Sequence, residues 1–208
     1  MIRRDDDGDL TILTLNRPDK ANSLTRAMLH ALIDTLNDAG DRAQAVILTG
    51  TGKVFSAGAD LDEARAGLAT DPVWERLSAT VAALPCLTIA ALNGTLAGGA
   101  FGMALACDIR LAVPGAKFFY PVMKLGFLPQ PSDPARMAAL IGPGRARMIL
   151  MGGARVEAAE ALNWGLVDRL SSPESLLDDA RALADDACTA PRGHAGRIKA
   201  MIPRDWSH

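Results

Sequence analysis

Hydrophobic and polar positions along the chain alternate between the spacing typical of strands and that of helices. Residues 10–18 (LTILTLNRP) contain leucine and β-branched residues and end at a proline, which predicts a first strand. Between residues 24 and 40, hydrophobic residues recur three or four positions apart, which predicts an amphipathic helix that ends at Gly40. The residues on this predicted face are Leu29, Leu32, Ile33 and Leu36.

Three short hydrophobic segments have the composition of strands that are buried on both faces of a sheet. They are residues 45–50 (AVILTG), 86–92 (CLTIAAL) and 109–113 (IRLAV), and predicted helices separate them. Strands that alternate with helices are joined by crossovers and lie parallel to one another. The pattern therefore predicts an α/β fold that is built on a parallel sheet.

The second half of the chain is predicted to be mainly helical after one irregular stretch. Prolines interrupt residues 117–134 repeatedly, so no regular element is predicted there. Helices follow, broken by the sequence GPG at 142–144 and by the turn NWGLVD at 163–168. A last long helix is predicted from about residue 173 to residue 190.

Two segments that contain glycines follow neighbouring predicted strands. Residues 54–61 (VFSAGADL) come after one buried strand, and residues 93–102 (NGTLAGGAFG) come after the next. The carboxyl ends of parallel strands are where α/β sheets bind ligands. Because backbone amides at the start of a helix lack internal partners, the pair Gly98 and Gly99 is predicted to donate hydrogen bonds to an anion. Gly94 and Gly102 are predicted instead to let the helix pack closely.

Two motifs for nucleotide binding are incomplete. Residues 97–102 (AGGAFG) resemble a dinucleotide fingerprint, but alanine replaces its first glycine, and no acidic residue lies between Asp108 and Asp133 to bind the ribose. Residues 50–54 (GTGKV) contain the Gly-Lys pair of a phosphate-binding loop, but valine replaces the required serine or threonine. A nicotinamide-dependent oxidoreductase therefore stays open only as a remote alternative.

Composition and charge narrow the classes of partner. The 208 residues, of which 49% are hydrophobic, suffice for one sizeable core. A net charge of -2 without long runs of one sign gives no reason to expect nucleic acid or a membrane as a partner. Three widely spaced cysteines and an N-terminus without an apolar signal core suggest a cytoplasmic protein, and the lack of a CxxC pattern gives no metal site.

Six segments resemble the crotonase, or enoyl-CoA hydratase/isomerase, superfamily in order and spacing. They are residues 16–24 (NRPDKANSL), 46–61 (VILTGTGKVFSAGADL), 85–112 (PCLTIAALNGTLAGGAFGMALACDIRLA), Phe118 with Pro121, 125–129 (LGFLP) and 152–170 (GGARVEAAEALNWGLVDRL). The resemblance implies a crotonase-like spiral of ββα turns over residues 1–170 and a shortened helical C-terminal segment over residues 171–208. It also implies an acyl-CoA thioester as the ligand, no cofactor apart from the coenzyme A of that substrate, and a homotrimer or a dimer of trimers.

The resemblance further implies which residues meet the ligand. The thioester carbonyl would accept hydrogen bonds from the backbone amides of Ala59 and Gly99, which together form an oxyanion hole. Negative charge develops on that oxygen during reactions next to a thioester, and fixed donors stabilise it. The residues implied around the rest of the ligand, largely through backbone atoms, are Lys20, Ala21, Ser56, Ala57, Asp60 and Gly98. Lys20 could equally be an ordinary exposed lysine.

The residues that usually move protons in this family are missing. Members that hydrate a 2-enoyl thioester use two glutamates, one to activate water and one to deliver a proton to the α-carbon. The corresponding residues here are Gly102 and Val122, and neither can move a proton. Some isomerases of the family place an acid on the following loop, where this chain has Gln130.

Two nearby residues are candidates to replace the missing acids. Asp133 is the nearest carboxylate, and Tyr120, the single tyrosine, could donate to a substrate. Each has a structural alternative. Ser132 or Asp133 could cap a helix that has Pro134 as its first residue, and Tyr120 could pack in the core.

The sequence therefore predicts an acyl-CoA enzyme of the enoyl-CoA hydratase/isomerase family that stabilises a thioester enolate or oxyanion. Because Gly102 and Val122 replace both glutamates, we expect isomerase, decarboxylase or thioesterase chemistry instead of ordinary hydration. The alternative is a non-catalytic homologue that binds acyl-CoA and has lost the chemistry.

Overall fold

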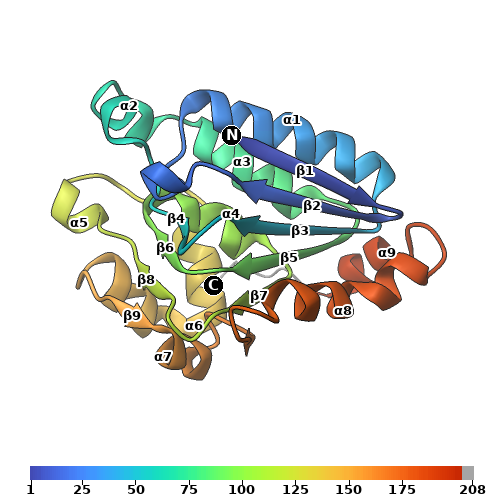
Figure 1. Ribbon diagram of the computed structural model, residues 1–208. Helices are drawn as coiled ribbons and strands as arrows, with labels where there is room; N and C mark the ends of the chain where they lie inside the picture. The colour runs from blue at the N-terminus through green and yellow to red at the C-terminus, as the bar shows by residue number, and fades with distance from the viewer. Residues whose placement is uncertain (203–208) are drawn as a thin grey trace.

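The computed structural model describes residues 1–202 and contains two β-sheets (Figure 1). The larger sheet has the strand order β1-β2-β3-β5-β7-β10, and the smaller has the order β4-β6-β8-β9. The strands of the larger sheet are β1 (Ile2–Asp7), β2 (Leu10–Leu15), β3 (Ala45–Gly50), β5 (Leu87–Leu92), β7 (Ile109–Ala112) and β10 (Arg169–Leu170). Those of the smaller sheet are β4 (Val54–Ser56), β6 (Thr95–Ala97), β8 (Lys117–Phe119) and β9 (Val156–Glu157).

Successive segments of the chain contribute one strand to each sheet. β3 is followed by β4, β5 by β6 and β7 by β8, and a helix comes after each of these pairs. The strands from β2 to β10 in the larger sheet pair in parallel, and so do β4, β6 and β8 in the smaller one. This repeated step confirms the predicted α/β class and the spiral of ββα turns.

The helices fill the connections and cover the sheets. α1 packs on α3, α3 on α4 and α4 on α6, while α8 packs against β3, β5 and β7. Within the described residues, none of these helices is long and apolar enough to cross a membrane. The helices are α1 (Arg26–Arg42), α2 (Leu61–Arg65), α3 (Val73–Ala83), α4 (Phe101–Ala106), α5 (Val122–Leu125), α6 (Asp133–Leu150), α7 (Ala158–Trp164), α8 (Leu176–Thr189) and α9 (His194–Met201).

The first helix confirms the predicted hydrophobic face but not the predicted end. The four hydrophobic residues of that face are all buried. The helix continues through Gly40 to Arg42, so the prediction that Gly40 ends it is wrong. A Cβ atom at Gly40 would lie 2.8 Å from a methyl carbon of Leu84. Gly40 therefore allows α1 to approach the end of α3.

An edge strand precedes the strand that the sequence predicts to be the first. β1 pairs antiparallel with β2, and Ile2 lies opposite Leu15. Five of its six residues are charged, so it carries no alternation of hydrophobic and polar residues. Charged side chains on an edge strand discourage pairing with another chain. This element was missed because its sequence suits an edge and not a core.

Short elements also occupy the stretch that was predicted to be irregular. β8 and α5 lie within residues 117–134, so that expectation is wrong. Further along, the predicted breaks are confirmed, because Gly142 has a non-helical backbone inside α6 and Gly165 ends α7 in the left-handed conformation. α8 corresponds to the predicted last long helix. α8 and α9 lie in the predicted C-terminal segment, of which residues 203–208 lie outside the described part.

Gly94 has the packing role that the sequence predicts. It lies between β5 and β6, where a Cβ atom would overlap the carbonyl oxygen of Lys53. No rotation of a side chain can relieve this overlap, because the obstacle is backbone. The glycine therefore fixes how closely the loop before β4 approaches the start of β6.

We expect Gly94→Ala to destabilise the protein by about 2–3 kcal/mol, since overpacking against rigid backbone forces the chain to shift. Equilibrium unfolding in urea measures the change. Gly115→Ala is the matched control, because Gly115 is exposed and has no atom within 4 Å of the position of an added Cβ. Equal stability of the two variants would contradict the packing role of Gly94.

Candidate functional site

The two predicted glycine loops meet backbone to backbone. β4 pairs in parallel with β6, so the loops after these strands start side by side. A Cβ atom at Gly58 would lie 2.9 Å from the carbonyl oxygen of Ala97 and 3.5 Å from the amide nitrogen of Gly99. Gly58 and Gly98 also have φ angles of +89° and +58°, which glycine adopts at little cost. The contact therefore requires glycine on both sides.

The two amides that the resemblance implies as donors have no partner among the described residues. Leu24 bonds to the residues on either side of Ala59, donating to the carbonyl of Gly58 at 2.7 Å and accepting from the amide of Asp60 at 2.9 Å, but the Ala59 amide makes no bond. Gly99 lies in the first turn of the short helix Gly98–Ala100, where amides have no internal partner. Both residues are partly exposed. Two backbone amides on adjacent loops are therefore not engaged within the described part of the protein.

A third loop, residues 16–24, lies against the glycine loop of residues 54–61. It contains the short helix Pro18–Lys20, after which Ala21 accepts a hydrogen bond from the amide of Ala57 at 3.0 Å. The hydroxyl of Ser56 donates to the carbonyl of Asn22 at 2.8 Å and is fully buried. Three of the predicted ligand-contacting residues, Ala21, Ser56 and Ala57, are thus brought together at one place.

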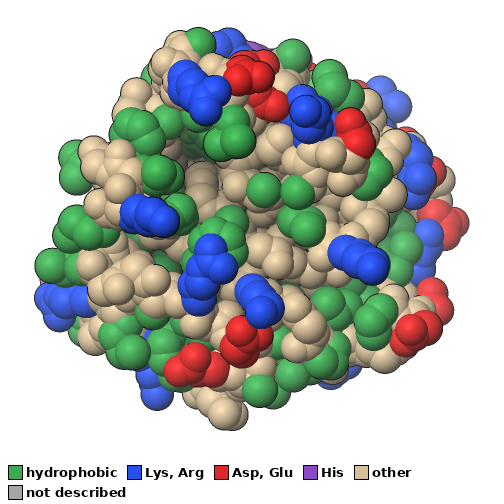
Figure 2. Space-filling view, turned by 60° about the vertical axis from the view of Figure 1, so that its left-hand side comes forward, with side chains coloured by type: hydrophobic (Ala, Val, Ile, Leu, Met, Phe, Trp, Pro, Cys, Tyr) green, Lys and Arg blue, Asp and Glu red, His purple; other side chains and the backbone are tan. Residues whose placement is uncertain are grey.

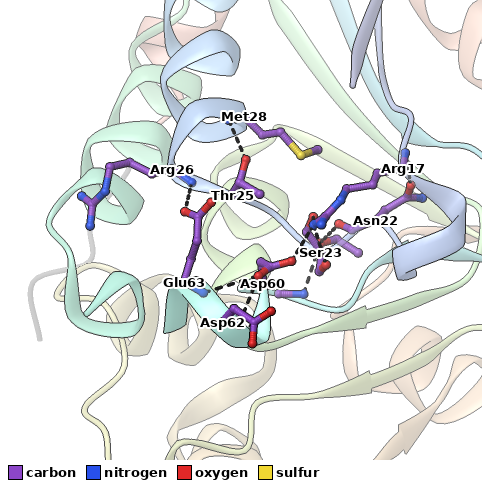
Figure 3. Close-up of polar contacts among 11 residues, drawn as sticks. Arg17, Asn22, Ser23, Thr25, Arg26, Met28, Asp60, Asp62 and Glu63 are labelled. Carbon is purple, nitrogen blue, oxygen red and sulfur yellow. Dashed lines mark hydrogen bonds and ion pairs between the residues drawn. The ribbon is translucent and has the colours of Figure 1, made fainter. Parts of the chain in front are cut away.

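The side chain of Asp60 is engaged in holding these loops (Figure 3). Its carboxylate accepts from Arg17 at 2.7 Å and also accepts from the first amides of α2, which it caps. The Arg17 guanidinium and these amides hold the pKa of Asp60 below its usual value. Glu63 then accepts from the amide of Arg26 at 2.7 Å, which ties α2 to the start of α1. Asp60 is therefore an ionised structural group beside the site.

Two asparagines for which the sequence predicted no role, Asn22 and the partly exposed Asn93, organise the same loops. Asn22 is fully buried, donates to the carbonyls of Thr51 and Val54 at 2.9 and 2.7 Å, and accepts from the amide of Arg17. Asn93 accepts from the amide of Gly50 at 3.0 Å and donates to the carbonyl of Gly52. An asparagine can supply donors and acceptors together, which loop backbone needs. Both asparagines lie in segments that carry the family resemblance, residues 16–24 and 85–112, and this was the signal that could have identified them.

The face above these loops is hollowed (Figure 2). This view brings forward the side of the molecule on which α2 and α5 project, and hydrophobic and basic side chains surround the hollow. Leu61 at the start of α2 and Met123 in α5 have exposed fractions of 74% and 59%. The lysines Lys20, Lys53 and Lys124 are exposed on the neighbouring loops and on α5. Such a surface suits a ligand with an apolar part and a negatively charged part.

The candidate acids Asp133 and Tyr120 lie next to each other, in contact with the first residues of α4. The Tyr120 hydroxyl donates to Oδ2 of Asp133 at 2.9 Å, and both side chains are buried. Asp133 is the first residue of α6 and makes no capping bond with its own helix, so the alternative that it caps this helix is wrong. Pro134 is accordingly the second helical residue, not the first.

Burial controls the protonation of this pair. Removal of the carboxyl group from water raises the pKa of Asp133 to about 7, and the Tyr120 hydrogen bond only partly offsets the rise. The same burial and the neighbouring Asp133 raise the pKa of Tyr120, so its hydroxyl stays protonated. Of this pair, Asp133 is therefore the side chain that can gain or lose a proton near neutral pH.

The side chains of Val122 and Gln130, which lie where the family usually has an acid, cannot transfer a proton. Val122 is buried and apolar. Gln130 is buried, and its backbone amide lies 3.5 Å from the Tyr120 hydroxyl. Within residues 1–202, no group of three or more His, Cys, Asp and Glu side chains is placed to hold a metal ion.

Comparison with known proteins gives one consistent family. The model of the enoyl-CoA hydratase/isomerase family matches residues 6–207. YngF of Bacillus subtilis, which is named for the same family, is 40% identical over 184 residues, which are 84% of this chain and 70% of YngF. The probable enoyl-CoA hydratase echA8 of Mycobacterium tuberculosis is 36% identical over 198 residues, with 93% and 77% of the two chains covered.

Solved structures give the same result. The enoyl-CoA hydratase EchA8_6 of Mycobacterium marinum superposes with a TM-score of 0.88 at 32% identity, covering 96% of this chain and 97% of that one. An enoyl-CoA hydratase of Bacillus anthracis has the same TM-score and identity and covers 96% and 81%. The match of sequence along nearly the whole chain and the match of fold agree. The chain therefore belongs to the enoyl-CoA hydratase/isomerase family of the crotonase superfamily.

Proposed function

We propose that the protein is an enzyme that binds an acyl-CoA thioester and stabilises an enolate or a tetrahedral oxyanion. The thioester oxygen lies between the backbone amides of Ala59 and Gly99. The observation that carries this proposal is that both amides are unbonded and stand on loops in direct contact. Preorganised donors of this kind are worth about 3–4 kcal/mol each to the transition state.

The coenzyme A part of the ligand lies along the loops that meet at Ala57. Lys20 is exposed and supplies a positive charge, and Ala21 and Gly98 present backbone at the same place. Ser56 and Asp60 contribute through backbone atoms, because their side chains are bonded within the protein. Coenzyme A enters as part of the substrate, and no other cofactor is needed for enolate chemistry.

The reaction is isomerisation, decarboxylation or thioester hydrolysis instead of ordinary hydration. Hydration of a 2-enoyl thioester needs one group to activate water and another to protonate the α-carbon. Gly102 and Val122 supply neither, although the relatives named above are called hydratases. Each of the other reactions proceeds through an anion on the thioester oxygen and needs at most one acid or base.

The assembly that we propose is a homotrimer or a dimer of trimers. Apolar surface near the C-terminal helices supports self-association. A cavity of about 660 Å³ lies between α6, α8 and α9, and leucine, isoleucine and alanine side chains make up much of its lining. Ile198, which lines this cavity, and Met201, which is also on α9, have exposed fractions of 49% and 81%. Surface of this kind is costly to leave in contact with water.

We predict that crotonyl-CoA is hydrated at least about 100-fold more slowly than by hydratases with both glutamates, since general acid and base catalysis contribute at least this much. Mass spectrometry of crotonyl-, 3-enoyl-, malonyl-type and saturated acyl-CoAs in oxygen-18 water checks this. A shifted double bond, loss of carbon dioxide or free coenzyme A identifies the reaction. Hydration at a family-typical rate would contradict the prediction, and binding without turnover of any thioester would favour the non-catalytic homologue.

We predict a solution mass of three or six chains of 21.9 kDa. Light scattering coupled to size exclusion measures it. Ile198→Glu should shift the mass toward the single chain, because a charge would then lie on the apolar surface. A single-chain mass for the unmodified protein would overturn the proposed assembly.

A further inference from the structure

A carboxyl group occupies the place where a side chain at position 102 would begin. A Cβ atom at Gly102 would lie 3.0 Å from Oδ1 of Asp133, 3.5 Å from Oδ2 and 3.3 Å from Cβ of Ser78. Real Cβ atoms seldom approach other atoms as closely as 3.0 Å. A side chain at residue 102 and the carboxyl group of Asp133 therefore compete for one space. The chain lacks an acid on α4 here but brings one to the same point from α6.

One oxygen of this carboxyl group is held, and the other is free. Oδ2 accepts the Tyr120 hydroxyl bond, and the Tyr120 ring stacks on Phe101 with the ring centres 5.4 Å apart and the planes at 15°. Oδ1 is buried and has no hydrogen-bond partner among residues 1–202. A buried oxygen without a donor is costly in a folded protein and therefore needs an explanation, and a catalytic role is one such explanation. Oδ1 is also the oxygen nearer to the position that a Cβ atom at Gly102 would take.

The charged groups around Asp133 balance one another. Arg136 donates to Ser78 at 2.8 Å, and its positive charge lowers the pKa of Asp133. Glu75 accepts from the backbone amide of Ser132 at 3.1 Å, and its negative charge raises that pKa. Burial has a larger effect than either charge and raises the pKa of Asp133 to about 7. A group with this pKa can accept a proton and return it at neutral pH.

The carboxyl group of Asp133 lies beside Gly102, about one helical turn from one of the proposed oxyanion donors. Gly99 and Gly102 are three residues apart where the short helix Gly98–Ala100 runs into α4. Residues at this spacing lie on the same side of a helix, about one turn apart. A thioester whose oxygen is held at Gly99 would thus have its α-carbon and γ-carbon close to this turn.

We propose that Asp133 moves the proton in this site, with Tyr120 as a positioning residue, and that the substrate class is 3-enoyl-CoA thioesters. This inference rests on the proposed acyl-CoA function. Oδ1 takes a proton from the α-carbon, and the electron pair of the broken C–H bond delocalises into a dienolate whose oxygen bonds to Ala59 and Gly99. The proton on Asp133 then adds to the γ-carbon, which yields the 2-enoyl thioester and regenerates the carboxylate.

Burial has a consequence for the proton that is transferred. Asp133 has an exposed fraction of 0%, so a proton on its carboxyl group is shielded from exchange with bulk water. A single carboxyl group that both removes and returns the proton therefore passes the same hydrogen from one carbon to the other. Part of the product formed in deuterium oxide should therefore carry two protium atoms at the γ-carbon, whereas uptake of solvent deuterium would leave one.

The test compares the unmodified protein with Asp133→Asn on trans-3-hexenoyl-CoA in deuterium oxide, followed by proton NMR. We expect the substitution to lower isomerisation at least about 100-fold, while hexanoyl-CoA still binds with a Kd within about threefold by calorimetry, since the amides of Ala59 and Gly99 are unchanged. Asp185→Asn is the matched control, because Asp185 is an exposed residue of α8. An Asp133→Asn variant that isomerises at the unmodified rate overturns the role of Asp133.

The pH profile separates proton transfer from a purely structural role. Isomerisation should rise with pH through about 7, as Asp133 becomes the carboxylate that accepts a proton. The hydrogen bond from Tyr120 lowers the pKa of Asp133, so Tyr120→Phe should move the midpoint to higher pH. A midpoint that stays in place in Tyr120→Phe overturns the positioning role of Tyr120.

The competition for space provides a second, independent test. Gly102→Glu should lower the melting temperature when Asp133 is present and be tolerated better together with Asp133→Gly, because the double variant exchanges one carboxyl group for the other. We expect the double variant to isomerise 3-hexenoyl-CoA faster than Asp133→Gly alone. Equal effects of Gly102→Glu on stability in both backgrounds overturn the shared space. If hexanoyl-CoA fails to bind the unmodified protein, the proposed function fails first, and this inference fails with it.

Discussion

The close contact between two glycine loops is the constraint on which the rest of the site depends. Gly58 packs on the backbone of Ala97 and lies near Gly99, at distances that leave no room for a side chain. The contact exists because β4 and β6 are parallel neighbours in the smaller sheet. It brings the segments that carry the amides of Ala59 and Gly99 next to each other, which is what the proposed oxyanion hole requires. The proposed binding of a thioester oxygen depends on this pairing.

The polar groups around the loops serve to hold this contact in place. Asn22 and Asn93 bind loop carbonyls and amides that would otherwise be unsatisfied. The pair of Arg17 and Asp60 joins the segment before α1 to the start of α2. These interactions use side chains from three separate parts of the sequence. They explain how a site made of backbone can still be rigid, which electrostatic stabilisation requires.

The sequence was most informative where a structural feature depends on residues that are close together in the chain. Buried strands, the amphipathic helix α1 and the glycine loops were predictable because hydrophobic spacing and glycine chemistry are local signals. β1 was missed, because a charged edge strand has no such signal. The end of α1 at Gly40 was predicted wrongly, because Gly40 serves contact with Leu84, which is distant in the sequence.

In the candidate site, too, local features could be predicted from the sequence, and contacts between distant residues could not. Ala59 and Gly99 could be proposed from the sequence by resemblance, and their unbonded state required the structure. The closeness of Asp133 to Gly102 could not be predicted, because these residues lie on different helices and neither matches the usual family pattern. The roles of Asn22 and Arg17 depend on contacts between loops and were invisible for the same reason.

The most direct measurement is the infrared carbonyl stretch of a bound acyl-CoA whose thioester carbon is labelled with carbon-13. Two hydrogen bonds from Ala59 and Gly99 would polarise the carbonyl, so we expect a band at lower frequency in the complex than in water. The isotope identifies the band against the protein background. A band at the frequency of free thioester in a fully bound sample would contradict the proposed oxyanion hole.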